Sequence, residues 1–375
     1  MTRNRTGVRA RAEFPAESGN GVPRHREPGG KPGTGPGSTR GRLRGWGGVT
    51  GMAVACAVTA SLTLVPLSHG GAGAFGGDAS GPGTAQAVQA RADDCTDPEA
   101  SLPPSSADGP DVAEIKARGK LIAGVDQNSF RWGYRNPENR ELEGFDIDLV
   151  RAIAKAILGD PDAVIFRAIP TNQRIAALEN DKVDVVVRTM TINCARLEQV
   201  SFSTAYFQTG QQVLAPKESP ITGFDKSLAG KRICTAEGST AYEALEKQSF
   251  GSVFKDEHDG TEADEDRLTV PNQLDCLVRL QLGEVDAVVT DNALAAGQAA
   301  QDPAVELKGD KPFTTEYYGV ATKRGANDLV ARVNQVLVDY RRGGADSPWM
   351  VSYRKWLEAG LPGISAPPAP KYRSN

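Results

Sequence analysis

Apolar and polar positions follow a regular order along the chain from residue 111 onward. Helical spacing marks "VAEIKARG", "FDIDLVRAIAKAIL" and "NQRIAALEND", and in the second of these Phe145, Leu149, Ile153 and Ile157 form one apolar stripe. Continuous apolar runs of strand length are "KLIAGVD", "AVIFRAI" and "VDVVVRTMT". Strands that alternate with helices in this way predict a parallel, doubly wound sheet.

The same order then repeats, with strands in "KRICTAEG", "LTVPN" and "VDAVVTD" and helices in "STAYEALEKQ", "QLDCLVRLQLGE" and "NALAAGQAA". A further strand, "EYYGVATK", and two closing helices follow. We therefore predict an α/β fold of two lobes, each a doubly wound sheet. Lobe I comprises residues 111–210 and 316–365, lobe II residues 211–315, and residues 366–375 form a tail. Crossovers near 208–216 and 311–322 join the lobes, and small ligands are expected in the cleft between them.

The segment before residue 111 has a different composition. Residues 1–48 are rich in Gly, Pro and Arg without an apolar period, and are expected to be disordered. Residues 49–67 carry no charge and are long enough for a transmembrane anchor or the apolar region of a signal segment, and 68–110 read as a linker. We favour the anchor, because a cleavage site near Ala85–Ala90 would lie far from the apolar run. Basic residues precede the run, so either alternative places the following part outside the cytoplasm.

Charge is divided unevenly along the chain. Ten basic and three acidic residues give residues 1–48 a net charge of +7, and since the whole chain carries −4, the remainder carries −11. An acidic folded part argues against nucleic acid as its partner.

Five cysteines are present. Cys56 lies inside the apolar run, where a buried thiol is a better interpretation than the lipid-attachment motif that "AVAC" weakly resembles. Cys95, Cys194, Cys234 and Cys276 lie in the exported part, where two disulfides are expected with three pairings open. We favour Cys234–Cys276 and Cys95–Cys194.

Several motifs resemble those of the family-3 bacterial extracellular solute-binding proteins. "GFDIDLVRAIAKAI" fits the family signature, "RTMTINCAR" resembles its A-G-M-T-I-T-x-E-R segment, "CTAEGST" its lobe-two loop and "VDAVVTD" its last ligand-contacting strand. The resemblance covers about residues 115–360 and implies the type II periplasmic-binding-protein fold. "NQRIAAL" is similar to the glutamate/aspartate branch, and the extra cysteines resemble actinobacterial glutamate-binding members, some of which act as sensors. Arg188 and Thr189 depart from the usual Ala-Gly, and Cys194 from the usual Pro or Asp.

The resemblance also implies roles for individual residues. Arg196 and Thr191 would bind the ligand's α-carboxylate, since a planar guanidinium forks onto a carboxylate. Asp291 would bind the α-ammonium group. Arg174 would read a side-chain carboxylate, and Arg188 is a second candidate for that role. The remaining ligand candidates are Thr189 beside Arg188, Ser239 and Thr240 at a helix N-terminus, and the aromatic residues Phe130 and Trp132.

Each of these residues also has a structural interpretation. Arg196 could pair with Glu198 on the surface, Ser239 and Asp291 could cap helices, and Trp132 could belong to the core. Arg174 could be a solvated charge on a helix face. Arg188 could be satisfied by Asp184 or Asp126 instead of a ligand. Asp184 and Asp286 are expected to be structural.

An enzyme on the same fold is the competing class. The three histidines do not form a catalytic or metal-binding pattern, so we expect no catalytic residue, metal or cofactor. The predicted ligand is a polar amino acid, glutamate or aspartate, with glutamine and asparagine as alternatives. The expected partner of this monomer is the permease of an ABC importer, or alternatively a membrane sensor, at the outer face of the cytoplasmic membrane.

Overall fold

The structure, a computed structural model, describes residues 95–256 and 268–374. The predictions for residues 1–48 and 49–67 and for most of the linker lie outside these ranges. Within the described ranges, no helix is long and apolar enough to cross a membrane.

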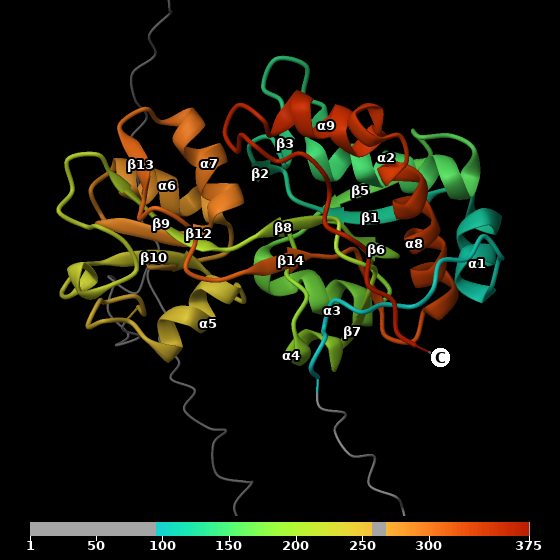
Figure 1. Ribbon diagram of the computed structural model, residues 1–375, viewed down its shortest axis with the longest axis horizontal. Coiled ribbons are helices and arrows are strands. Elements are labelled where there is room, and N and C mark those ends of the chain that lie inside the picture. The colour runs from blue at the N-terminus through green and yellow to red at the C-terminus, as the bar shows by residue number, and fades with distance from the viewer. Residues whose placement is uncertain (1–94, 257–267, 375) are drawn as a thin grey trace, which may run out of the picture. The chain divides into compact units, whose positions relative to one another are not determined.

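Lobe I is built on a five-stranded sheet in the order β5-β1-β6-β15-β7 (Figure 1). β1, β5 and β6 run parallel, as predicted, whereas β15 is antiparallel to both β6 and β7. The sheet is therefore mixed rather than parallel, because β15 enters it on the return from lobe II. The strands are β1 (Leu121–Val125), β5 (Val164–Ala168), β6 (Val185–Val186), β7 (Val200–Phe202) and β15 (Ala321–Lys323).

Helices cover this sheet, and three short strands form a separate small sheet in the same lobe. The helices are α1 (Pro110–Arg118), α2 (Phe145–Leu158), α3 (Arg174–Glu179), α4 (Cys194–Leu197), α8 (Asn327–Arg341) and α9 (Pro348–Trp356), and the short strands are β2 (Asn128–Ser129), β3 (Gly133–Arg135) and β4 (Leu142–Glu143). Single 3-10 turns occur at Thr171–Gln173 and Gly344–Asp346. The predicted stripe of α2, Phe145 to Ile157, is buried in the core. Gly144 precedes it at φ 130°, and a Cβ there would lie 2.3 Å from the carbonyl oxygen of Trp132.

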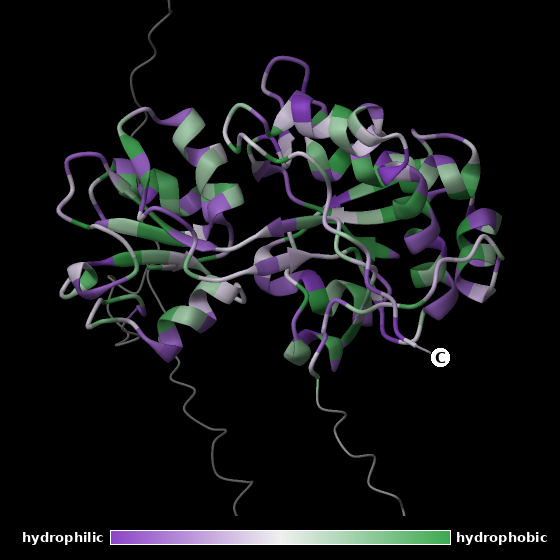
Figure 2. Ribbon diagram, in the orientation of Figure 1, coloured by the Kyte–Doolittle hydropathy of each residue, from purple (hydrophilic) through white to green (hydrophobic). Residues whose placement is uncertain are grey.

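Lobe II is built on a second five-stranded sheet, in the order β11-β10-β12-β9-β13. Its parallel strands are β10 (Ile233–Ala236), β11 (Thr269–Val270) and β12 (Ala287–Asp291), whereas β9 (Gln211–Pro216) is antiparallel to β12 and to β13 (Val305–Lys308). The helices are α5 (Thr240–Lys247), α6 (Gln273–Gln281) and α7 (Asn292–Gln301), with a 3-10 turn at Lys226–Leu228. Apolar residues concentrate in the strands and on one side of the helices of both lobes (Figure 2).

Two antiparallel strands join the lobes: β8 (Phe207–Thr209) pairs with β14 (Glu316–Tyr318). They lie between the two large sheets in Figure 1. The sequence predicted "EYYGVATK" as one strand, but β14 and β15 are separate. Gly319 lies between them in close contact with Ile192 and Phe202, where a Cβ would lie only 2.8–2.9 Å from their side chains.

Two disulfides are present, Cys234–Cys276 within lobe II and Cys95–Cys194. The first pair is completely buried in the core between β10 and α6. The second attaches the start of the described chain to α4, the helix that carries Arg196. The pairing is the one favoured from the sequence.

Candidate functional site

Two buried arginines of lobe I meet at one backbone carbonyl of lobe II. Arg174 Nη2 and Arg196 Nη2 each donate to Gly238 O over 3.1 Å. Arg174 also donates to Thr171 O, and Arg196 to Thr191 O, over 2.8 and 2.7 Å. Both side chains are about 95% buried, so the surface alternatives for these two residues do not hold.

These two guanidinium groups have only carbonyl oxygens as partners in the described part of the chain. Burial lowers the pKa of Arg196, and it lowers that of Arg174 further together with the charges of Arg196 and Arg188. Buried cations are normally paired with anions. The pair therefore has the character of an anion-binding site at the junction of the lobes.

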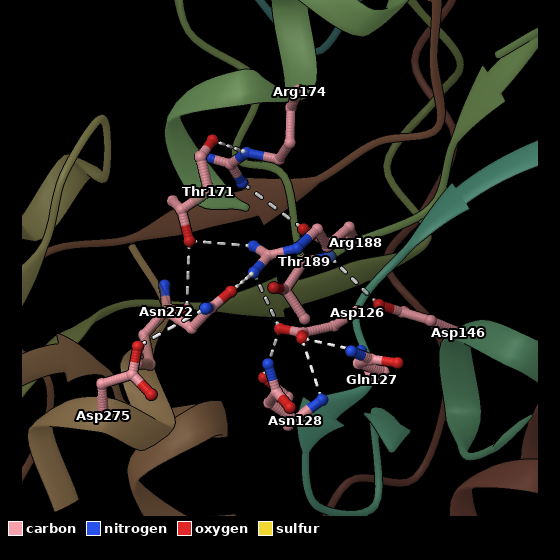
Figure 3. Close-up of polar contacts among 12 residues, drawn as sticks. Asp126, Gln127, Asn128, Asp146, Thr171, Arg174, Arg188, Thr189, Asn272 and Asp275 are labelled. Carbon is pink, nitrogen blue, oxygen red and sulfur yellow. Dashed lines mark hydrogen bonds and ion pairs between the residues drawn. The ribbon is translucent and has the colours of Figure 1, made fainter. Parts of the chain in front are cut away.

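Arg188 has a different environment, which Figure 3 shows. Its Nη2 lies 3.0 Å from Asp126 Oδ2 and donates to Asn272 Oδ1 across the junction, and its Nη1 donates to Thr171 Oγ1. The side chain is completely buried. Of the two acids proposed from the sequence, Asp126 is its partner, whereas Asp184 binds Arg118 and the N–H of Ile122. The guanidinium charge of Arg188 is thus compensated within the protein.

Hydroxyl groups from both lobes converge on a carboxylate that sequence reasoning missed. Thr191 Oγ1 of lobe I and Thr240 Oγ1 of lobe II donate to Glu316 Oε2 over 2.7 and 2.8 Å. Glu316 opens β14, and the only sequence signal for it was an acid within a predicted crossover. In this structure Thr191, expected on the ligand's α-carboxylate, and Thr240, expected at a ligand site formed by a helix N-terminus, therefore both bind the protein's own carboxylate.

Asp291 ends β12 and is buried beside Glu316. Tyr318 OH donates to its Oδ2 over 2.6 Å, and Gln211 Nε2 contacts its Oδ1. Burial, and secondly the charge of Glu316, raises the pKa of Asp291 to about 7. The carboxylate makes no capping bond to α7, so the capping interpretation of this residue does not hold.

Two other predicted residues have mainly local roles. Thr189 has a left-handed backbone, with φ 42°, and its N–H donates to the buried Asp146 (Figure 3). Ser239 caps α5 by accepting a hydrogen bond from the N–H of Tyr242, as its structural interpretation predicted.

The aromatic candidates do not join the polar residues. Trp132 is 1% exposed, packs edge-on against Phe207 and Tyr318, and donates from Nε1 to Ala293 O. The ring of Trp132 is therefore part of the core, in agreement with its structural interpretation. Phe130 packs against Tyr134 and lines a separate cavity of about 520 Å³ with residues of α6 and α7, so the structure does not bring it to the arginines either.

Comparison with known proteins defines the class. The family of bacterial extracellular solute-binding proteins, family 3, matches residues 121–359, and the chain belongs to this family. It is therefore an extracytoplasmic two-lobed binding protein with the type II fold, and not an enzyme.

Individual relatives agree with this family. The chain is 34% identical over 248 residues to the ABC transporter glutamine-binding protein GlnH of Bacillus subtilis, covering 66% of this chain and 84% of that protein. It is 28% identical over 229 residues to the glutamate-binding protein GluB of Corynebacterium efficiens, covering 58% and 73%. Among solved structures, an ancestral arginine-binding protein bound to glutamine superimposes with a TM-score of 0.56 at 33% identity, covering 64% and 98%.

Proposed function

We propose that the protein binds an acidic amino acid, glutamate or aspartate, between its lobes and delivers it to the permease of an ABC importer. The observation that carries the proposal is the pair Arg174 and Arg196, two buried guanidiniums whose hydrogen bonds in the described chain all go to carbonyl oxygens and none to an acid. Arg196 would bind the α-carboxylate, and Arg174 a second carboxylate on the side chain.

Binding requires the lobes to separate first. Arg174, Arg196 and Arg188 all contact residues of lobe II directly, and their side chains are buried. A ligand that bridges the lobes replaces such contacts and stabilises the closed state, which is the form that a permease would recognise. The β8–β14 pair is the natural hinge, because both connections between the large sheets pass through it.

Glutamine is the second candidate, because a glutamine-binding protein is among the most similar relatives. A neutral amide would bring no negative charge into contact with Arg174, which favours the acidic ligand.

Calorimetry on the purified full-length chain with L-glutamate, L-aspartate, L-glutamine and L-asparagine tests the proposal. We expect an acidic amino acid to bind with a Kd below about 100 μM, equivalent to about 5.5 kcal/mol, and at least about tenfold more tightly than its amide. Tighter binding of glutamine than glutamate would refute the acidic specificity. Binding of none of the four would refute the proposed ligand class.

A further inference from the structure

Gln211 is a buried glutamine beside the hinge, and only the nitrogen of its side-chain amide makes hydrogen bonds within the described residues. It opens β9 and pairs in register with Asp291 of β12. Its side chain is 1% exposed, and Nε2 contacts both Thr240 Oγ1 and Asp291 Oδ1. Its Oε1 is buried and has no hydrogen-bond partner among the described residues. A buried acceptor without a donor is costly, and such groups in native proteins call for an explanation.

The surrounding contacts fix which end of the amide is which. The hydroxyl hydrogen of Thr240 is donated to Glu316, so Thr240 Oγ1 presents a lone pair to Gln211. The carboxylate oxygen of Asp291 is an acceptor as well. Two acceptors on one side require the amide nitrogen there, and the amide oxygen is left facing away from both.

The unused oxygen belongs to a group of acceptors with excess negative charge. Asp291 and Glu316 interact electrostatically, and Thr240 contacts both Gln211 and Glu316. Three hydroxyl groups, from Thr191, Thr240 and Thr314, hold the Glu316 carboxylate in place. Two neighbouring carboxylates and one free amide oxygen match a primary ammonium group, which has a positive charge and three N–H donors.

We propose that Gln211 Oε1 accepts a hydrogen bond from the ligand's primary ammonium group, and that Glu316 faces the same ammonium alongside Asp291. This inference rests on the proposed function and adds to it. Glu316 belongs to the hinge strand β14, and Gln211 begins β9, the strand that follows hinge strand β8, so the ammonium links the hinge region to the ligand. The subsite selects primary ammonium compounds, because a methyl group on the nitrogen removes one of the three donors.

The test compares two variants of neighbouring buried glutamines in the full-length chain. Gln211→Leu removes the acceptor, whereas Gln212→Leu is the matched control. Gln212 is also buried, but its Nε2 donates to Lys308 O and Gly309 O on the other side of β9. Calorimetry is run with L-glutamate, L-glutamine and N-methyl-L-glutamate, and circular dichroism and thermal unfolding confirm that both variants are folded.

We expect Gln211→Leu to weaken L-glutamate and L-glutamine equally, by about tenfold to a hundredfold, as is typical for a lost hydrogen bond to a charged group. The preference of the wild type for L-glutamate over N-methyl-L-glutamate should shrink in this variant, which an indirect effect through Asp291 would not produce. Gln212→Leu should leave all affinities within about twofold, because its amide is remote from the ligand.

Other outcomes have distinct meanings. Three results would overturn the assignment of Gln211 while leaving the proposed function intact. These are unchanged affinity in Gln211→Leu, an unchanged preference against N-methylation, and a loss of affinity for only one of L-glutamate and L-glutamine. Failure of the wild type to bind any amino acid would overturn the proposed function, and this inference with it.

Discussion

Arg188 and Asp126 form an ion pair of 3.0 Å between the ends of two neighbouring strands, β6 and β1, and neither side chain is open to solvent. Asp126 also accepts hydrogen bonds from Ser129 Oγ and from the N–H groups of Gln127 and Asn128. The pair is therefore an internal unit. Arg188, the second candidate for reading a side-chain carboxylate, is bound within the protein, so Arg174 is the better candidate for that role.

Replacing Arg188 should affect stability much more than specificity. In Arg188→Leu the buried Asp126 carboxylate loses its counter-charge, and removing one partner of a buried pair typically costs about 3–5 kcal/mol. Urea unfolding should show this loss, and the double variant Asp126→Asn/Arg188→Leu should recover part of it. The ratio of glutamate to glutamine affinity should not change. A stable single variant with a reduced ratio would mean that Arg188 reads the ligand.

Arg174 and Arg196 should differ in which ligands they affect. Arg174→Gln removes the positive charge proposed to bind the side-chain carboxylate. The affinity for L-glutamate should therefore fall at least about tenfold more than the affinity for L-glutamine, which corresponds to a difference of roughly 1.4 kcal/mol or more in binding free energy. Arg196→Gln should weaken both by a similar factor, because the α-carboxylate is common to them. Titration calorimetry of the two variants with both ligands measures this. Equal losses in both variants for both ligands would contradict the division of roles.

The sequence predicted much of the fold because the apolar pattern determines it. The stripe of α2 and the repeated strand–helix order are local signals, and the structure contains both. The mixed character of the sheets was missed, because strand direction depends on where the chain returns from the other lobe. The split of "EYYGVATK" depends on the tertiary contacts of Gly319, which no local pattern records.

The site was only partly accessible from the sequence. Motif resemblance located Arg174, Arg196 and Asp291, and the structure brings them to the junction of the lobes. Motif resemblance could not choose between the ligand and Asp126 as the partner of Arg188, because that choice depends on the positions of two strands. Gln211 and Glu316 carry no motif, and their interactions with Asp291 depend on how strands β9, β12 and β14 lie in the fold.

Ligand binding should become tighter as the pH rises through about 7. Below the raised pKa of Asp291, about 7, the carboxyl is neutral and cannot pair with an ammonium group, whereas above it the charge is present. The same raised pKa contributes to the stability of the ligand-free protein at low pH, and this contribution is lost as the pH rises through about 7.

Calorimetry from about one pH unit below the pKa of Asp291 to one above it measures the effect of pH on affinity. Ligand binding below this pKa should release a proton. Asp146 is a second buried acid with a pKa raised to about 7, so Asp291→Asn is the necessary control. This variant should bind weakly with little dependence on pH. A pH dependence that survives in Asp291→Asn would assign the titration to another group.

The buried disulfide of lobe II should stabilise the folded protein by an amount typical of disulfides. Cys234 and Cys276 are completely buried and 42 residues apart, a loop for which the chain-entropy estimate is about 4 kcal/mol. Cys234→Ala/Cys276→Ala should lower the free energy of unfolding by about that amount. Peptide mapping without reduction should recover Cys234 linked to Cys276 and Cys95 linked to Cys194. A peptide linking Cys194 to Cys276 would contradict the structure.

Gly238 should be required for closure of the lobes rather than for folding of either one. Its carbonyl accepts from Arg174 and Arg196, its φ is 69°, and a Cβ on it would lie 3.0 Å from Cα of Asn172 in lobe I. Gly238→Ala therefore adds a backbone cost of about 1–2 kcal/mol and a contact between the lobes that is too close. We expect a loss of ligand affinity of about tenfold or more, because only the closed state suffers the close contact.

Gly230 provides a matched control for this prediction. Its φ is 68°, almost the same as that of Gly238, but a Cβ on it would meet no atom of the described residues within 4 Å. Gly230→Ala should therefore lose a similar amount of thermal stability and keep the wild-type affinity, because the backbone cost is the same and closure is unaffected. Thermal unfolding and calorimetry on both variants separate the two effects. If both variants lost affinity to the same extent, the loss would come from backbone strain within lobe II, and the contact with Asn172 would have no part in closure.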